Sequence, residues 1–127
     1  MDSQTRTLLK KSAEDEQILF ISTISDTIAA FHAQQAVEKL MKALLAELGI
    51  DYPKFHDLNW LRARLESVGE VFPATPVDFA EFIPFATVWR YDDPPEEVVL
   101  DRAKAVDTVR ILREFVVKRV AELNRQV

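Results

Sequence analysis

The amino-acid sequence predicts an all-α domain, an up-and-down bundle of four to five helices. The chain has only two glycines, whereas hairpin turns and phosphate-cradling loops need more residues that tolerate positive φ. Its apolar residues recur every three or four positions, which is the spacing of a helix face, and no segment alternates as a strand does. A length of 127 residues, 48% hydrophobic and 29% charged, is typical of one globular domain. We therefore expect a single domain over residues 1–127.

Composition also excludes several classes of protein. The net charge of −5 provides no overall field that would attract a nucleic-acid backbone. The absence of cysteine excludes disulfides and thiolate metal sites. The first residues lack the basic-then-apolar order of a secretion signal, and no apolar run approaches the roughly 20 residues that cross a bilayer. We expect a cytoplasmic protein without membrane contact, metal or cofactor.

The first two helices are predicted from apolar spacing. Residues 3–20 carry a modest apolar stripe, and the acidic run at residues 14–16 is predicted to be its solvated face. Ser25 is a good N-cap for a second helix that ends at Gly49. The apolar stripe of this second helix is wide, which predicts a central position in the bundle. Its polar strip consists of Gln34, Gln35, Glu38, Lys39 and Lys42.

Three further helices are predicted downstream. Leucines at helical spacing indicate a short helix from Leu58 to Gly69. Thr75, followed by a proline, reads as the N-cap of a fourth helix, which must kink or split at Pro84. Pro95 can be an early residue of a long amphipathic helix that reaches nearly to the C-terminus.

Three landmarks in this order suggest a family. Residues 31–45 read FHAQQAVEKLMKALL, His56-Asp57-Leu58 follows a loop, and Arg90-Tyr91 comes later. Together they resemble the signature of the HEPN domain family over nearly the whole chain. The resemblance implies a helical bundle that is usually dimeric and is often encoded beside a minimal nucleotidyltransferase. It also implies toxin–antitoxin or nucleotide-related roles.

The chain departs from the family's catalytic pattern. Many HEPN members are metal-independent ribonucleases that use an arginine followed roughly four to six residues later by a histidine. The residues after Arg90 include Pro94, Pro95 and Glu96, and the two histidines, His32 and His56, both precede it. An arginine cannot replace the missing group, because proton transfer at a ribose hydroxyl needs a side chain that titrates near neutrality. We therefore lean against an enzyme and assign no catalytic residue.

Four candidate binding residues lie within the first two landmarks. Gln35 and Lys42, together with Lys39, could face a nucleotide phosphate, although a solvated helix face on which Glu38 pairs with Lys42 is the interpretation that we favour. His56 could be a base or a pH-sensitive contact. We favour a capping role for His56 and Asp57 at the start of the third helix.

The third landmark leaves two interpretations open. Arg90 could bind phosphate while Tyr91 stacks on a base, or Arg90 could pair with a nearby acidic residue and fasten the turn. A platform of aromatic side chains for bases is less favoured than a core or dimer interface, given their helical spacing. These aromatic residues are Trp60, Phe79, Phe82 and Phe85.

The function that we expect is a non-catalytic HEPN module. It would dimerise or bind a nucleotide and act with a nucleotidyltransferase partner in a system of the toxin–antitoxin type. The alternative is a metal-independent HEPN ribonuclease with an altered active site, in which folding brings His56 near Arg90. A nucleotide or an RNA is the ligand expected in either case.

Overall fold

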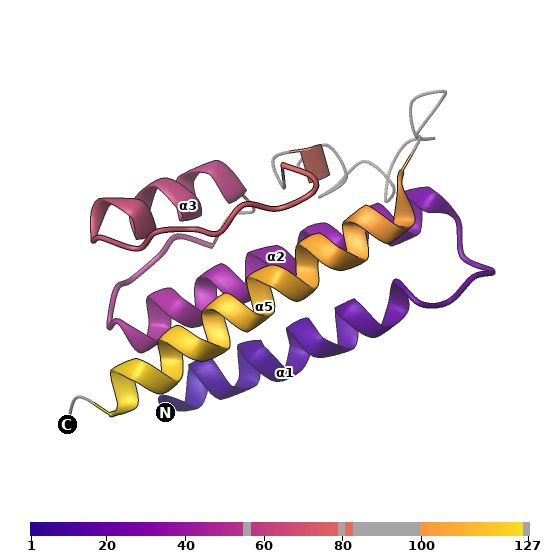
Figure 1. Cartoon of the computed structure of the whole chain (residues 1–127). Helices are drawn as coiled ribbons and strands as arrows, with labels where there is room; N and C mark the ends of the chain where they lie inside the picture. Colours follow the sequence, from indigo (N-terminus) through magenta and orange to yellow (C-terminus); the bar gives the residue numbers. More distant parts are fainter. Residues whose placement is uncertain (55–56, 79–80, 83–99, 126–127) are drawn as a thin grey trace.

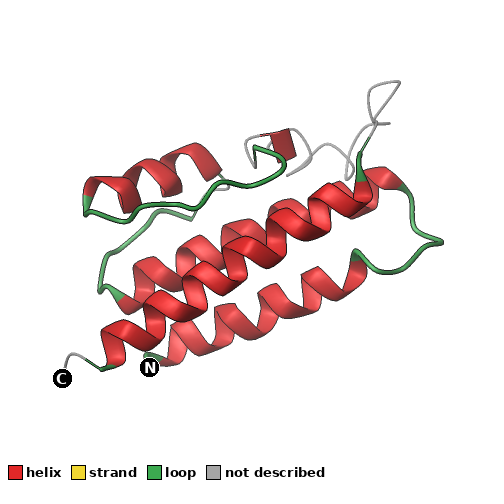
Figure 2. Cartoon of the chain, viewed as in Figure 1, coloured by secondary structure: helices red, strands yellow, loops and turns green. Residues whose placement is uncertain are grey.

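The computed structural model describes residues 1–54, 57–78, 81–82 and 100–125. This part of the chain contains four α-helices: α1 (Ser3–Ile18), α2 (Asp26–Glu47), α3 (Leu58–Ser67) and α5 (Arg102–Asn124). Figure 2 shows helices and loops, without a strand, in the described residues. The predicted all-α bundle is confirmed.

The three long helices lie along one another (Figure 1). A short turn joins α1 to α2, so these two helices run in opposite directions. Helix α5 runs beside α2 in the same direction, and the shorter α3 lies on the other side of α2 from α1 (Figure 1). Among the described residues, no helix is both long and apolar enough to cross a membrane.

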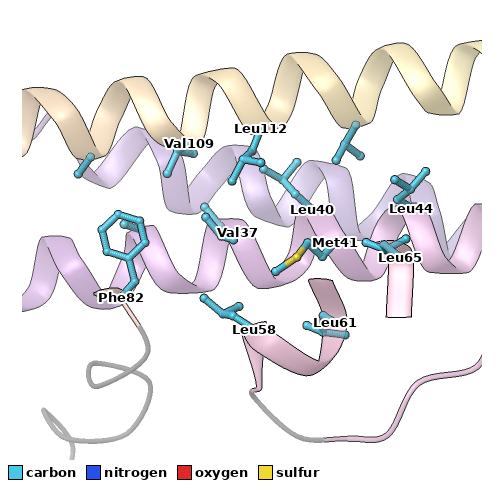
Figure 3. Close-up of a cluster of buried hydrophobic side chains, with 14 of the residues drawn as sticks. Val37, Leu40, Met41, Leu44, Leu58, Leu61, Leu65, Phe82, Val109 and Leu112 are labelled. Atoms are coloured by element: carbon cyan, nitrogen blue, oxygen red, sulfur yellow. The ribbon is translucent and has the colours of Figure 1, made fainter. Parts of the chain in front are cut away.

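Helix α2 is the centre of the bundle, as predicted. Thirteen of its side chains are buried, because its neighbours cover it on several sides. Figure 3 shows its Val37, Leu40, Met41 and Leu44 facing side chains of α3 and α5. The core is completed by residues from those helices and from the segment before α5, among them Leu58, Leu61, Leu65, Phe82, Val109 and Leu112.

Side-chain caps fix where the helices begin. The predicted cap Ser25 accepts a hydrogen bond from the Ile28 backbone N–H at 3.2 Å. Asp57 does the same for the Trp60 N–H at 3.1 Å, which confirms its predicted capping role. After α2, Gly49 takes φ 73°, a left-handed conformation that glycine adopts without steric cost and that ends the helix.

Two predicted helix starts are wrong. Thr75 does not cap a helix, because its hydroxyl donates to the Val77 carbonyl at 2.7 Å and the four residues from Thr75 to Asp78 are not helical. The rest of the predicted fourth helix, apart from a short 3₁₀ turn at residues 81–82, lies outside the described residues. The last helix begins at Arg102, where Asp101 accepts from the Lys104 N–H at 3.1 Å, and not near Pro95.

The acidic run on α1 is not a solvated face. Glu14 is exposed as expected, but Asp15 is buried and Glu16 is half-buried. Both of these carboxylates have cationic partners on other helices, Lys39 for Asp15 and Arg113 for Glu16. The prediction failed because a partner on a neighbouring helix, invisible in local sequence, can hold a charge inside a fold.

Candidate functional site

Four side chains of the polar strip of α2 form a hydrogen-bonded ladder, in which residues 34 and 38 are buried and residues 35 and 42 are half-buried. Gln35 Nε2 donates to Gln34 Oε1 at 2.6 Å, and Gln34 Nε2 donates to Glu38 Oε1 at 3.0 Å. Lys42 Nζ donates to Glu38 Oε2 at 3.1 Å. Residues 34, 38 and 42 are four apart, so their side chains stand one above another on the helix. We call Gln34, Gln35, Glu38 and Lys42 the amide–carboxylate ladder.

The solvated-face interpretation of this strip is wrong, although its predicted Glu38–Lys42 pair is present. Gln34 is 0% exposed and Glu38 is 3% exposed. Burying an amide and a carboxylate is costly unless each polar atom is paired. The ladder supplies such pairing, which explains why two glutamines, a glutamate and a lysine lie close together in sequence here.

Tyr52 joins the ladder to α1. Lys42 Nζ lies 5.5 Å from the centre of the Tyr52 ring, within the range of a cation–π interaction. The Tyr52 hydroxyl accepts a hydrogen bond of 2.6 Å from Gln4 Nε2. Burial raises the pKa of the Tyr52 phenol, as does the charge of Asp2, while the hydrogen bond from Gln4 lowers it.

A pocket with both polar and apolar lining residues opens beside Tyr52. Its volume is about 330 Å³, and it lies between the start of α1 and the loop that follows α2. Two aspartates and one lysine line it, so its charge is mixed rather than suited to an anionic phosphate. The lining residues are Asp2, Gln4, Ala46, Gly49, Ile50, Asp51, Tyr52 and Lys54.

A second polar cluster lies between α1 and α2. The Asp15 carboxylate bonds to His32 Nδ1 at 2.8 Å through one oxygen and to Lys39 Nζ at 2.5 Å through the other. Asp15 is 8% exposed, so both partners face a largely desolvated charge. His32 is therefore held as a structural contact, consistent with the sequence, which places no second ligand four residues from it.

The structure brings together two of the six candidate residues. Gln35 and Lys42 belong to the same ladder, whereas Asp57 is the exposed N-cap of α3. His56, Arg90 and Tyr91 lie outside the described residues. Of the aromatic side chains, Phe82 is buried in the core and Trp60 packs against the core, which agrees with the favoured interpretation as core residues. Phe79 and Phe85 lie outside the described residues.

Sequence reasoning missed the long-range partners. Nothing in the local sequence connects Tyr52 with Gln4, 48 positions away. Arg119 likewise grips the buried Glu70, with Nε–Oε1 at 2.7 Å and Nη2–Oε2 at 3.0 Å. Bonds to Glu70 and Glu122 raise the pKa of Arg119 further above its usual value. A carboxylate after a helix-ending glycine, in a loop otherwise rich in apolar residues, was the available signal for Glu70.

The chemistry of this site is that of hydrogen bonds and ion pairs. In the residues that the structure describes, no group of three or more histidine, aspartate or glutamate side chains is placed to hold a metal ion. The amide–carboxylate ladder has one carboxylate, one ammonium and two amides. Such a set can hold a helix in register or bind a polar group, but it contains no nucleophile paired with a base.

These features define a helical bundle organised around a polar ladder on its central helix. A family model for the HEPN domain matches residues 13–121, which covers α2, α3, most of α5 and the C-terminal end of α1. The chain belongs to the HEPN domain family. No curated protein and no solved structure gives a significant match to the chain.

Proposed function

We propose that this protein is a non-catalytic HEPN module that forms a homodimer and works with a separate protein, a minimal nucleotidyltransferase, in a system of the toxin–antitoxin type. The observation that carries the proposal is that the charged and amide side chains of the family signature bond to one another. Glu38 holds both Gln34 and Lys42, and Asp15 holds His32. Side chains so engaged stabilise a bundle rather than attack a substrate.

The sequence after Arg90 supports the same proposal. No histidine follows it in the chain, so the arrangement of arginine and histidine by which the family's ribonucleases cleave RNA is missing. An overall charge of −5 also gives no general attraction to an RNA backbone. Partnership with a nucleotidyltransferase is inferred from the family membership alone.

Nucleotide binding at the ladder is opposed by charge. Lys42 already has a carboxylate at 3.1 Å and an aromatic ring at 5.5 Å, so a phosphate at this ammonium would be repelled by Glu38. A nucleotide would then depend mainly on Arg90 and Tyr91. Calorimetry with ATP, GTP and their monophosphates tests nucleotide binding, and the absence of heat with all of them would exclude it while leaving the dimer proposal intact.

Light scattering during gel filtration tests the dimer directly. The purified chain is run over a range of micromolar concentrations, alone and mixed with a minimal nucleotidyltransferase from the same locus. We expect a mass of twice 14.6 kDa for the chain alone and co-elution with the enzyme in the mixture. A strict monomer at every concentration would refute the dimerising module.

A further inference from the structure

Helix α1 is attached to the bundle differently from the other long helix at the surface. Its buried side chains are Thr5, Ser12 and Asp15, none of them apolar. Helix α5, by contrast, buries Ala105, Val109, Leu112, Val116 and Val120, with Thr108 as the polar exception. Within α1, only Leu9 is among the side chains that pack on the apolar core, and that residue is half-buried. Leu19, the C-cap residue that follows α1, is buried in the core and fixes this end of the helix.

Charged contacts hold the C-terminal half of α1. Asp15 bonds to His32 and Lys39 on α2, and Glu16 Oε2 bonds to Arg113 Nε on α5 at 2.9 Å. These side chains keep between 10% and 23% of their surface exposed, so salt screens these pairs less than surface pairs but is not excluded from them. Because apolar burial here is slight, the attachment depends on charge to an unusual degree.

Hydrogen bonds from backbone and uncharged side-chain donors hold the N-terminal half, and one of their acceptors is the Glu47 carboxylate. The Thr5 hydroxyl donates to the Ala43 carbonyl at 3.3 Å, and Gln4 Nε2 donates to the Tyr52 hydroxyl. The Asp2 backbone N–H donates to Glu47 Oε2 at 3.1 Å. Single bonds of this kind contribute about 1 kcal/mol each, because water replaces them when they break.

The turn that follows α1 is fixed to the rest of the bundle. Arg102, at the start of α5, donates to the Ile21 carbonyl at 3.1 Å and to the Ile24 carbonyl at 2.9 Å. The same guanidinium bonds to Asp26 Oδ1 at 3.0 Å. If the contacts of α1 break, this turn holds the chain to α5 and can act as the hinge.

We propose that α1 is an electrostatic latch. Breaking the bonds of Asp15 and Glu16 opens α1 about the segment Leu19–Ile24, in which Leu19 stays packed in the core, while α2, α3 and α5 stay folded. Opening uncovers His32 and Lys39, two basic side chains that are bonded to Asp15 in the closed state. The latch therefore controls access to one face of the helix that carries the family signature.

Hydrogen exchange of the full chain, followed by mass spectrometry, tests the latch. Raising NaCl from about 0.05 M to about 1 M shortens the screening length to a few ångströms. We expect the exchange of α1 amides to accelerate by about tenfold, while α5 amides change by less than about twofold. Asp15→Asn, which keeps the shape and removes the charge, should accelerate α1 at low salt to a similar extent.

Glu114→Gln is the matched control. It removes one carboxylate from an exposed pair on α5, Arg110 Nη1–Glu114 Oε1 at 3.0 Å. The net charge therefore changes by the same amount as in Asp15→Asn. We expect this variant to leave α1 exchange as in the parent chain. The latch is overturned if α1 keeps its protection in high salt and in Asp15→Asn, or if α1 and α5 lose protection together, since the second result is global unfolding.

Discussion

Glu38 is the residue on which the amide–carboxylate ladder depends. One of its oxygens accepts from Gln34 and the other from Lys42, and its own surface is 3% exposed. A carboxylate in such a position is costly to bury, and it is retained when its partners are good. The ladder thus links the family signature to the stability of the central helix.

Removing this carboxylate tests its structural role. Glu38→Ala leaves the Lys42 ammonium and the buried Gln34 amide without their acceptor, so we expect a loss of about 2–4 kcal/mol in the free energy of unfolding. Glu66→Ala is the comparison, because its carboxylate pairs with Arg62 while 51% exposed, and we expect a loss below about 1 kcal/mol. Urea denaturation measures both, and equal losses would show that the ladder is not a source of stability.

The raised pKa of Tyr52 predicts how the stability of the fold depends on pH. Its pKa in the folded chain is raised, chiefly by burial and then by the Asp2 charge, so the folded state holds this proton more tightly than the unfolded state. Stability from Tyr52 is therefore full below its unfolded pKa of about 10 and is lost as pH rises through the higher folded value. We expect Tyr52→Phe to unfold with a shallower decline in stability above about pH 10. A parent chain with the same alkaline decline as the variant would contradict this.

At the scale of elements, helix starts depend on short side-chain caps. Asp57 accepts from the Trp60 N–H at the start of α3, a helix of only ten residues. We expect Asp57→Ala to cost about 1 kcal/mol of unfolding free energy, whereas Asp57→Asn, which also caps well, should cost only a few tenths. The loop residue Asp51, exposed and outside any helix, is the control position for an alanine substitution. Thermal unfolding distinguishes them, and equal effects of the alanine and asparagine variants at residue 57 would exclude a capping role.

The same elements show how far sequence alone reaches. The central helix, its Ser25 cap and the apolar faces of α2, α3 and α5 can be predicted from the local spacing of apolar and capping residues. The prediction of a helix start at Thr75 is wrong, although the residues after it have the composition of a helix start. The Thr75 hydroxyl bonds to the Val77 carbonyl, and Thr108 of α5 accepts from the Val77 N–H at 3.2 Å. A contact with a helix distant in sequence therefore determines the backbone conformation of this segment.

The candidate site was predictable only in part, for a similar reason. The Glu38–Lys42 pair is local and was expected, and the spacing of Gln34 from Glu38 puts them on the same stripe. What spacing could not give was the burial of that stripe, since the covering groups come from elsewhere in the chain. Asp15 shows the same limit, because its partners His32 and Lys39 lie 17 and 24 positions away.

At the scale of the whole molecule, this chain is a HEPN bundle whose signature residues build structure. The polar residues of α2 are internal partners, α1 lies against α2 through charged and polar contacts, and α5 supplies apolar side chains to the core. This division of roles fits a module that associates with other proteins. It also predicts that the isolated chain has no reaction of its own on RNA.

Incubation of the purified chain with tRNA, in the absence of any partner protein, shows whether the chain cleaves RNA on its own. We predict that the tRNA stays intact on a denaturing gel after prolonged incubation, and that the wild-type chain and an Arg90→Ala variant give the same result. Cleavage by the wild-type chain that is lost in Arg90→Ala would contradict the account and would establish an altered ribonuclease site.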